Sequence, residues 1–191
     1  MSARTPKSAL VALVALLAPA AGFAQSAPVS GAVAQEMVFA PEPVQVEMVE
    51  GHGLSEADAS ALQMVGSGQP YYGAIAISPD EGLMVEATVA AVNHHTAAAA
   101  EAAAIAGCEA KRKGKAACMV VARILPEGWT ARDLTLSRDA TVALGKDYKT
   151  PGALAVSPAT GNFALAGSAE AALAACAEKA KTDDCVVAVQ D

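Results

Sequence analysis

Four cysteines are the residues of this 191-residue chain with the most distinctive chemistry. Cys108 and Cys118 lie ten positions apart, and Cys176 and Cys185 lie nine apart. Zinc sites favour closely spaced C-x2-C ligands and redox enzymes favour the same short motif, and neither pair has that spacing. We therefore predict no metal and no thiol-redox centre, and we interpret the even number of cysteines as disulfides of an exported chain.

The position of each cysteine within its expected helix or strand indicates how the four pair. Two of them lie three residues after a large apolar residue, Ile105 or Leu173, so each thiol shares the core-facing side of a helix. The next cysteine begins a strand that should lie under that helix. We predict two local bridges, Cys108–Cys118 and Cys176–Cys185, while the two other connectivities of four cysteines remain open at this point.

Histidines and aromatic residues provide a second group of candidates. His94 and His95 lie where a strand meets a helix, and a helix N-terminus favours anions or metal ligands. Adjacent histidines point in different directions, however, so we expect a surface turn. Tyr71 and Tyr72 open a strand, where we favour packing at the sheet edge over a role in recognition. With Trp129, which follows a turn, they define a candidate binding surface: Tyr71, Tyr72, His94, His95 and Trp129.

Catalytic motifs are absent from the sequence. It contains no G-x-S-x-G, H-E-x-x-H, P-loop or Rossmann glycine pattern, so we assign no catalytic, cofactor-binding or metal residue. The leading hypothesis is a non-catalytic protein that binds a protein or an envelope component. A small exported enzyme of unrecognised type is the alternative. A pocket that gathers His94, His95 or His52 with a carboxylate such as Glu86 would favour that alternative.

An internal repeat organises the elements that position these residues. The sequence GAIAISP at 73–79 recurs as GALAVSP at 152–158, and Gly82 and Gly161 follow at the same distance. Each copy reads as strand, turn, strand, helix and strand, over 71–125 and 152–190. The fold class is α+β, with helices packed on a mainly antiparallel sheet and a local disulfide in each copy.

Individual elements follow from periodicity and capping residues. Alanine-rich residues 96–113 predict a helix, and Ser55 with Asp58, Ser137 and Ser168 predict three helix starts. The expected strands lie at 44–49, 74–77, 83–89, 118–124, 153–156, 162–166 and 185–189. We expect residues 25–70 to form an N-terminal extension of a strand and a helix, and residues 71–191 to pack as one globular unit.

The first 24 residues have the order of a secretory signal peptide. Arg4 and Lys7 precede an apolar run at 9–18 and a small-residue exit at 20–24, so the mature chain should begin at or near Gln25. The apolar run holds about ten residues, whereas a membrane-spanning helix needs about twenty. An uncleaved anchor is therefore the lesser alternative, and we expect a periplasmic or secreted protein.

Charge and composition exclude some classes of partner. The net charge is −7, and removal of the two leader cations makes the mature chain −9. Nucleic acid is therefore excluded as an expected partner. No later segment is apolar enough to cross a bilayer, so we expect no transmembrane segment after signal cleavage. Aromatic residues form only 4% of the chain, which disfavours an aromatic cage for a small ligand.

The repeated segments carry a family resemblance. The G-A-[IL]-A-[IV]-S strand, the A-[IL]-x-x-C helix and the strand that begins at a cysteine resemble a family of small exported bacterial domains of unknown function, over 71–191. Residues 69–86 and 93–95 are also similar to short alphaproteobacterial exported proteins sometimes labelled 5-aminolevulinic acid synthase. That activity needs pyridoxal phosphate, a Schiff-base lysine and a much larger two-domain fold. We therefore predict no cofactor.

Overall fold

The computed structural model describes residues 27–191, so the leader and the expected mature start at Gln25 lie outside the described residues. The helices are α1 (Gly31–Met37), α2 (Glu56–Ser67), α3 (Ala97–Glu109), α4 (Arg138–Lys146) and α5 (Ala169–Ala180). The strands are β1 (Val44–Met48), β2 (Gly73–Ile77), β3 (Val89–Ala91), β4 (Met119–Pro126), β5 (Ala153–Val156), β6 (Phe163–Ala166) and β7 (Val186–Gln190). Within the described part, no helix is long and apolar enough to span a bilayer.

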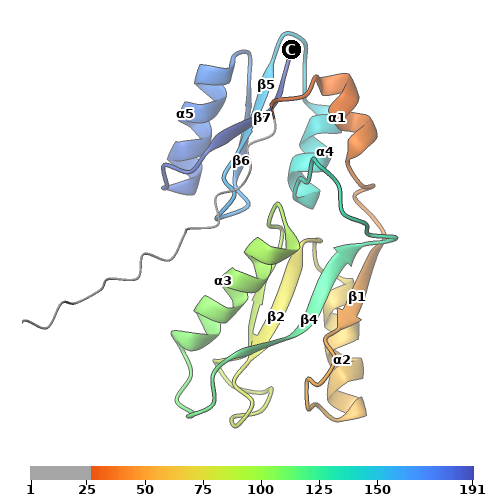
Figure 1. Cartoon of the computed structure of the whole chain (residues 1–191), viewed down its shortest axis with the longest axis vertical. Coiled ribbons are helices and arrows are strands. Elements are labelled where there is room, and N and C mark those ends of the chain that lie inside the picture. Colours follow the sequence, from red (N-terminus) through yellow and green to blue (C-terminus); the bar gives the residue numbers. More distant parts are fainter. Residues whose placement is uncertain (1–26) are drawn as a thin grey trace, which may run out of the picture.

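The strands form two antiparallel sheets, one in each half of the molecule (Figure 1). The first half contains β1–β4 with α2 and α3, and the second half contains β5–β7 with α1, α4 and α5. The first sheet has the order β1-β4-β2-β3 and the second has the order β6-β5-β7. Every paired strand in both sheets is antiparallel to its neighbour. The α+β class with a disulfide in each half is confirmed, and the strands divide between two sheets.

Each sheet lies between helices, and the alternation of small and large residues along its central strand explains why. Ala74 and Ala76 face α3, whereas Ile75 and Ile77 pack with Leu62 of α2. In the second sheet the alanines of β5 face α5, and its larger residues pack against α1 and α4. Successive residues of a strand point to opposite faces, so each central strand is buried on both sides.

The amino-terminal segment packs with the carboxyl-terminal half. Helix α1 packs with α4, and Val29 forms a parallel bridge with Val189 of β7. The chain therefore crosses between the halves twice, from α1 to β1 and again from β4 to α4 (Figure 1). The expected extension at 25–70 contains the predicted strand β1 and helix α2, but it also contains α1. That short helix, which Ser30 caps, was not predicted from the sequence.

The predicted helix starts agree with the structure. The hydroxyls of Ser55, Ser137 and Ser168 each accept a hydrogen bond from a backbone N–H of the first turn. The expected strand over 83–89 is wrong for most of its length, because the Thr88 hydroxyl donates to the Leu83 carbonyl at 2.6 Å and closes a turn. Only the end of that run enters β3.

The two central strands share an irregularity. The pairing of β2 with β4 shifts between Ile75 and Ala76, and the pairing of β5 with β7 shifts between Leu154 and Ala155. These positions correspond in the matching segments 73–79 and 152–158. The glycines that follow, Gly82 and Gly161, both have positive φ, at 82° and 74°.

Candidate functional site

Both predicted disulfides are present. Cys108 bonds to Cys118 with Cα atoms 6.1 Å apart, and Cys176 bonds to Cys185 with Cα atoms 6.2 Å apart. The helical cysteine of each pair is fully buried against its sheet. Each bridge therefore ties a helix end to the start of the strand that follows it.

A carboxylate beside each bridge connects the loop before the last strand to the turn after the central strand. In the first half Asp80 accepts the backbone N–H groups of Lys115 at 2.8 Å and Ala116 at 3.2 Å, and these bonds lower its pKa. In the second half the carboxylate belongs to the loop instead. Asp184 accepts the Ser157 hydroxyl at 2.7 Å and the Ala159 N–H at 2.8 Å.

The pKa of Asp184 reflects two opposed effects. Burial raises the pKa. Hydrogen bonds from the Thr182 and Ser157 hydroxyls and from the Ala159 N–H lower it by more, so the pKa lies below its ordinary value. Asp184 therefore remains ionised at neutral pH.

Four of the five residues of the candidate surface lie buried at the junction between the halves. Tyr71 and Tyr72 are each 1% exposed, His94 is 7% exposed and His95 is 3% exposed, whereas Trp129 is 40% exposed. The expectation that the two histidines form a surface turn is therefore wrong. The reason is tertiary: the second half of the chain packs over them, which no local pattern indicates.

The tyrosines anchor this junction. The Tyr71 hydroxyl donates to the Thr141 hydroxyl of α4 at 3.1 Å, and its ring meets that of Tyr72 edge-on at 5.3 Å. Burial raises the pKa of Tyr71, and it raises that of Tyr72 to about 12. Both rings pack with Phe39 and Leu125, so residues from both halves share one aromatic cluster.

His95 is bonded through both ring nitrogens to the second half. Its Nδ1 accepts the backbone N–H of Ser137, the N-cap of α4, at 3.0 Å. The proton must then lie on Nε2, which donates to the Asn162 carbonyl at 3.1 Å. Burial lowers the pKa of His95 to about 4. The imidazole is therefore neutral at physiological pH.

Asn93 and Gly161 bring the backbones of the two halves into contact. Asn93 has φ of 62°, and its side-chain amide exchanges two hydrogen bonds with Asp139, at 3.0 and 3.2 Å. A Cβ on Gly161 would lie 2.3 Å from the Asn93 carbonyl oxygen and 2.9 Å from the His94 Cα. Only a glycine allows this approach.

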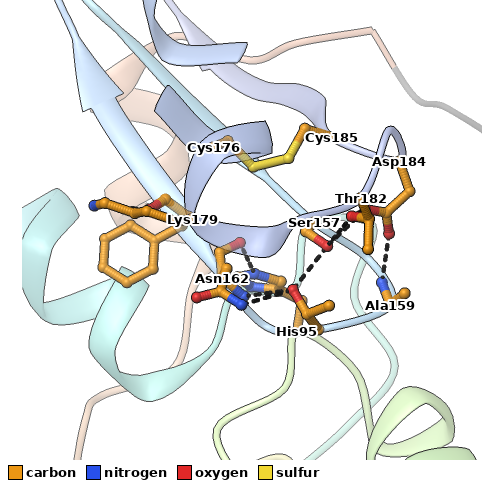
Figure 2. The surroundings of a disulfide bond; sticks show 11 residues. His95, Ser157, Ala159, Asn162, Cys176, Lys179, Thr182, Asp184 and Cys185 are labelled. Carbon is orange, nitrogen blue, oxygen red and sulfur yellow. Dashed lines mark hydrogen bonds between the residues drawn. A yellow bond between two sulfur atoms is a disulfide. The ribbon is translucent and has the colours of Figure 1, made fainter. Parts of the chain in front are cut away.

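A chain of polar contacts runs from the second disulfide to the junction (Figure 2). The Asp184 carboxylate holds Ser157, whose hydroxyl accepts that of Thr160 at 2.8 Å. The Thr160 oxygen in turn accepts the side-chain N–H of Asn162 at 2.9 Å. The Asn162 carbonyl accepts a hydrogen bond from His95 Nε2. The β5–β6 turn is therefore held at one end by Asp184 and at the other by His95.

An open cleft of about 930 Å³ lies beside β7 and this polar chain. One wall consists of Cys185 and the first three residues of β7, and another is the 133–135 segment that leads into α4. His95 lies at the start of α3 on the lining. The charged side chains that line the cleft are all acidic: Asp133, Asp183 and Asp184. Apolar lining comes from both faces of the second sheet, through Leu134, Val156, Leu173 and Val186.

The remaining candidate residues lie elsewhere. His52 belongs to the loop between β1 and α2, where its Nδ1 accepts the Leu54 N–H at 2.9 Å. Neither His52 nor Glu86 nor Trp129 lines the cleft. Across residues 27–191, no group of three or more histidines, cysteines or carboxylates is placed to hold a metal ion.

Comparison with known proteins finds no matching family model, curated protein or solved structure. Sequence reasoning missed the acidic residues of the cleft because they come from separate segments. The Asp183-Asp184 pair directly before Cys185 was the one local signal available.

Proposed function

We propose that this chain is an exported, periplasmic or secreted protein that binds a protein or envelope component in the cleft beside β7, without catalysing a reaction. The observation that carries the proposal is a large open cleft with an apolar lining and an acidic rim, beside an edge strand. Ligand sites are commonly clefts of about 300–1,000 Å³ with few polar groups.

Export is supported by two independent features. The leader has the order of a signal peptide, and both pairs of cysteines are in disulfides, which form and persist in oxidising compartments. The resemblance to small exported bacterial domains has the same implication.

The cleft gathers His95 with three aspartates, which is the arrangement expected of the alternative function, a small exported enzyme with His95 as its candidate catalytic group. Two contacts favour binding instead. Both ring nitrogens of His95 are already bonded to backbone groups, so the ring cannot take a substrate proton without losing the Ser137 contact. The Ser157 hydroxyl donates to Asp184, and not to a histidine that could activate it.

Fractionation and affinity capture test this function. We expect the osmotic-shock fraction to contain a chain that begins near Gln25 and carries both bridges. Immobilised protein should retain a component of that fraction, and Asp133→Lys should abolish the retention while Glu178→Lys, on α5 and outside the cleft, should not. A chain that stays in the cytoplasm, or equal capture by both variants, would contradict the proposal.

A further inference from the structure

We infer that the cleft takes an extended, basic peptide segment, which adds as a strand to the outer edge of β7. This inference rests on the proposed function and names the ligand class of the same site. Strand addition uses the backbone of an exposed sheet edge for affinity and flanking pockets for specificity.

The edge required for strand addition is present. β7 is the last strand of its sheet, and β5 occupies its inner side. On the outer side, Val29 donates to the Ala188 carbonyl at 3.3 Å and accepts the Gln190 N–H at 2.9 Å. Ala27 and Pro28, which precede Val29, also line the cleft, but among residues 27–191 no backbone hydrogen bond pairs them with Cys185–Val187. These residues line the cleft, so a chain in the cleft would lie beside unpaired backbone.

Apolar side chains lie on both faces of this edge. Leu173 of α5 lines the cleft from one face of the sheet, and Leu134 and Val156 line it from the other. Alternate residues of an added strand point to opposite faces. Peptide side chains on both faces of the added strand would therefore contact apolar residues of the cleft, which a flat sheet edge would not provide.

The charges select a basic segment. Asp133 and Asp183 are exposed at the rim, and the lining contains no lysine or arginine. The deeper polar groups are already paired within the chain, since Asp184 binds Ser157 and His95 binds Ser137 and Asn162. What remains for a ligand is strand backbone, apolar surface, two carboxylates and the Thr135 side chain. A small polar metabolite would find few partners there.

Synthetic peptides test the inference on the mature, disulfide-bonded protein. The probe is an end-capped seven-residue peptide that alternates lysine and valine. One control carries N-methyl groups on alternate backbone nitrogens, which removes strand hydrogen bonds and keeps the charge. A second control replaces every lysine by glutamate. Backbone amide shifts of labelled protein are followed by NMR during titration.

We expect saturable shifts centred on Cys185–Ala188, with affinity about tenfold weaker for the N-methylated peptide because its interstrand hydrogen bonds are lost. The glutamate peptide should also bind about tenfold more weakly. The Asp133→Asn/Asp183→Asn double variant should bind the lysine peptide about fivefold more weakly, whereas Glu178→Gln should bind it unchanged.

Three results would overturn the inference: equal binding of the N-methylated peptide, shifts that avoid β7, or no binding of the lysine peptide. Failure of the peptide with continued Asp133-dependent capture from the periplasmic fraction would leave the cleft as a site for another ligand class. Failure of both would remove the proposed function as well.

Discussion

At the scale of single residues, the fold buries the imidazole of His95 in its neutral form. The neutral ring fits its site because Nδ1 faces a backbone N–H, so a second ring proton has no acceptor there. The other ionisable groups that act on it are His94, which disfavours its charge, and Asp184, which favours it. Desolvation by burial outweighs the attraction to Asp184, and the pKa falls.

We expect the free energy of unfolding to decrease as the pH falls from 6.5 towards 4. His95 has its ordinary pKa of 6.5 in the unfolded chain and a pKa of about 4 when folded. Between these values the unfolded chain binds the extra proton, so acid favours unfolding, by up to about 3 kcal/mol in all. Urea unfolding at a series of pH values measures this, with His95→Gln as the control. Parallel pH profiles for the two proteins would contradict the assignment.

Asp184→Ala should lower the free energy of unfolding by about 2 kcal/mol, because the buried Ser157 hydroxyl and the Ala159 N–H lose their acceptor. The neighbouring Asp183 is exposed, so Asp183→Ala should change stability by less than about 0.5 kcal/mol. Thermal and urea unfolding compare the pair, and equal losses would show that the polar chain is not the cause.

At the scale of elements, the second disulfide holds one end of β7 and the amino-terminal segment holds the other. Cys185 immediately precedes the strand, whereas Val29 contacts Ala188 and Gln190. The last residue adds to that anchor, since the Asp191 carboxylate accepts the Gly31 N–H at 3.1 Å and the Tyr148 hydroxyl at 2.9 Å.

Loss of the second bridge should therefore loosen β7 from its bridge end. In a Cys176→Ala/Cys185→Ala variant we expect a loss of about 2–3 kcal/mol and faster amide exchange that begins at Val186 and Val187. The Cys108→Ala/Cys118→Ala variant should cost a similar amount but leave exchange in β7 unchanged. Hydrogen exchange by NMR measures both. Exchange that accelerates first at Gln190 would show that the outer anchor is the weaker one.

The helices and strands were largely predictable because their signals are local. Alternation of alanine with larger residues in 74–77 and 153–156 predicted the central strands, and serine caps predicted three helix starts. The turn at 83–88 was not predictable in this way. Its residues alternate like a strand, but one side-chain hydrogen bond closes them into a turn instead. The burial of His94 and His95 depends on contacts with residues more than 40 positions away, which no window of sequence contains.

At the scale of the whole molecule, the close approach at Gly161 determines how the halves fit together. Gly161→Ala should cost markedly more stability than Gly82→Ala. Both substitutions place alanine at positive φ, at an expected cost of about 1 kcal/mol. Only the Cβ at 161 meets backbone of the other half, at 2.3 Å, whereas that at 82 meets nothing within 4 Å.

Differential scanning calorimetry of the two glycine variants measures this difference. The Gly161 variant should also show altered near-ultraviolet circular dichroism from the tyrosine cluster, because Tyr71 and Tyr72 lie at the same junction. Equal melting temperatures for both variants would show that the halves adjust without cost.

Photo-cross-linking in intact cells tests whether the cleft beside β7 binds a partner after export. A photoreactive amino acid replaces Asp133 on the cleft rim, or Met84, which is 99% exposed and outside the cleft. We predict a discrete periplasmic adduct from position 133 that is absent from position 84. No adduct from position 133, or the same adduct from both positions, would show that no partner occupies the cleft.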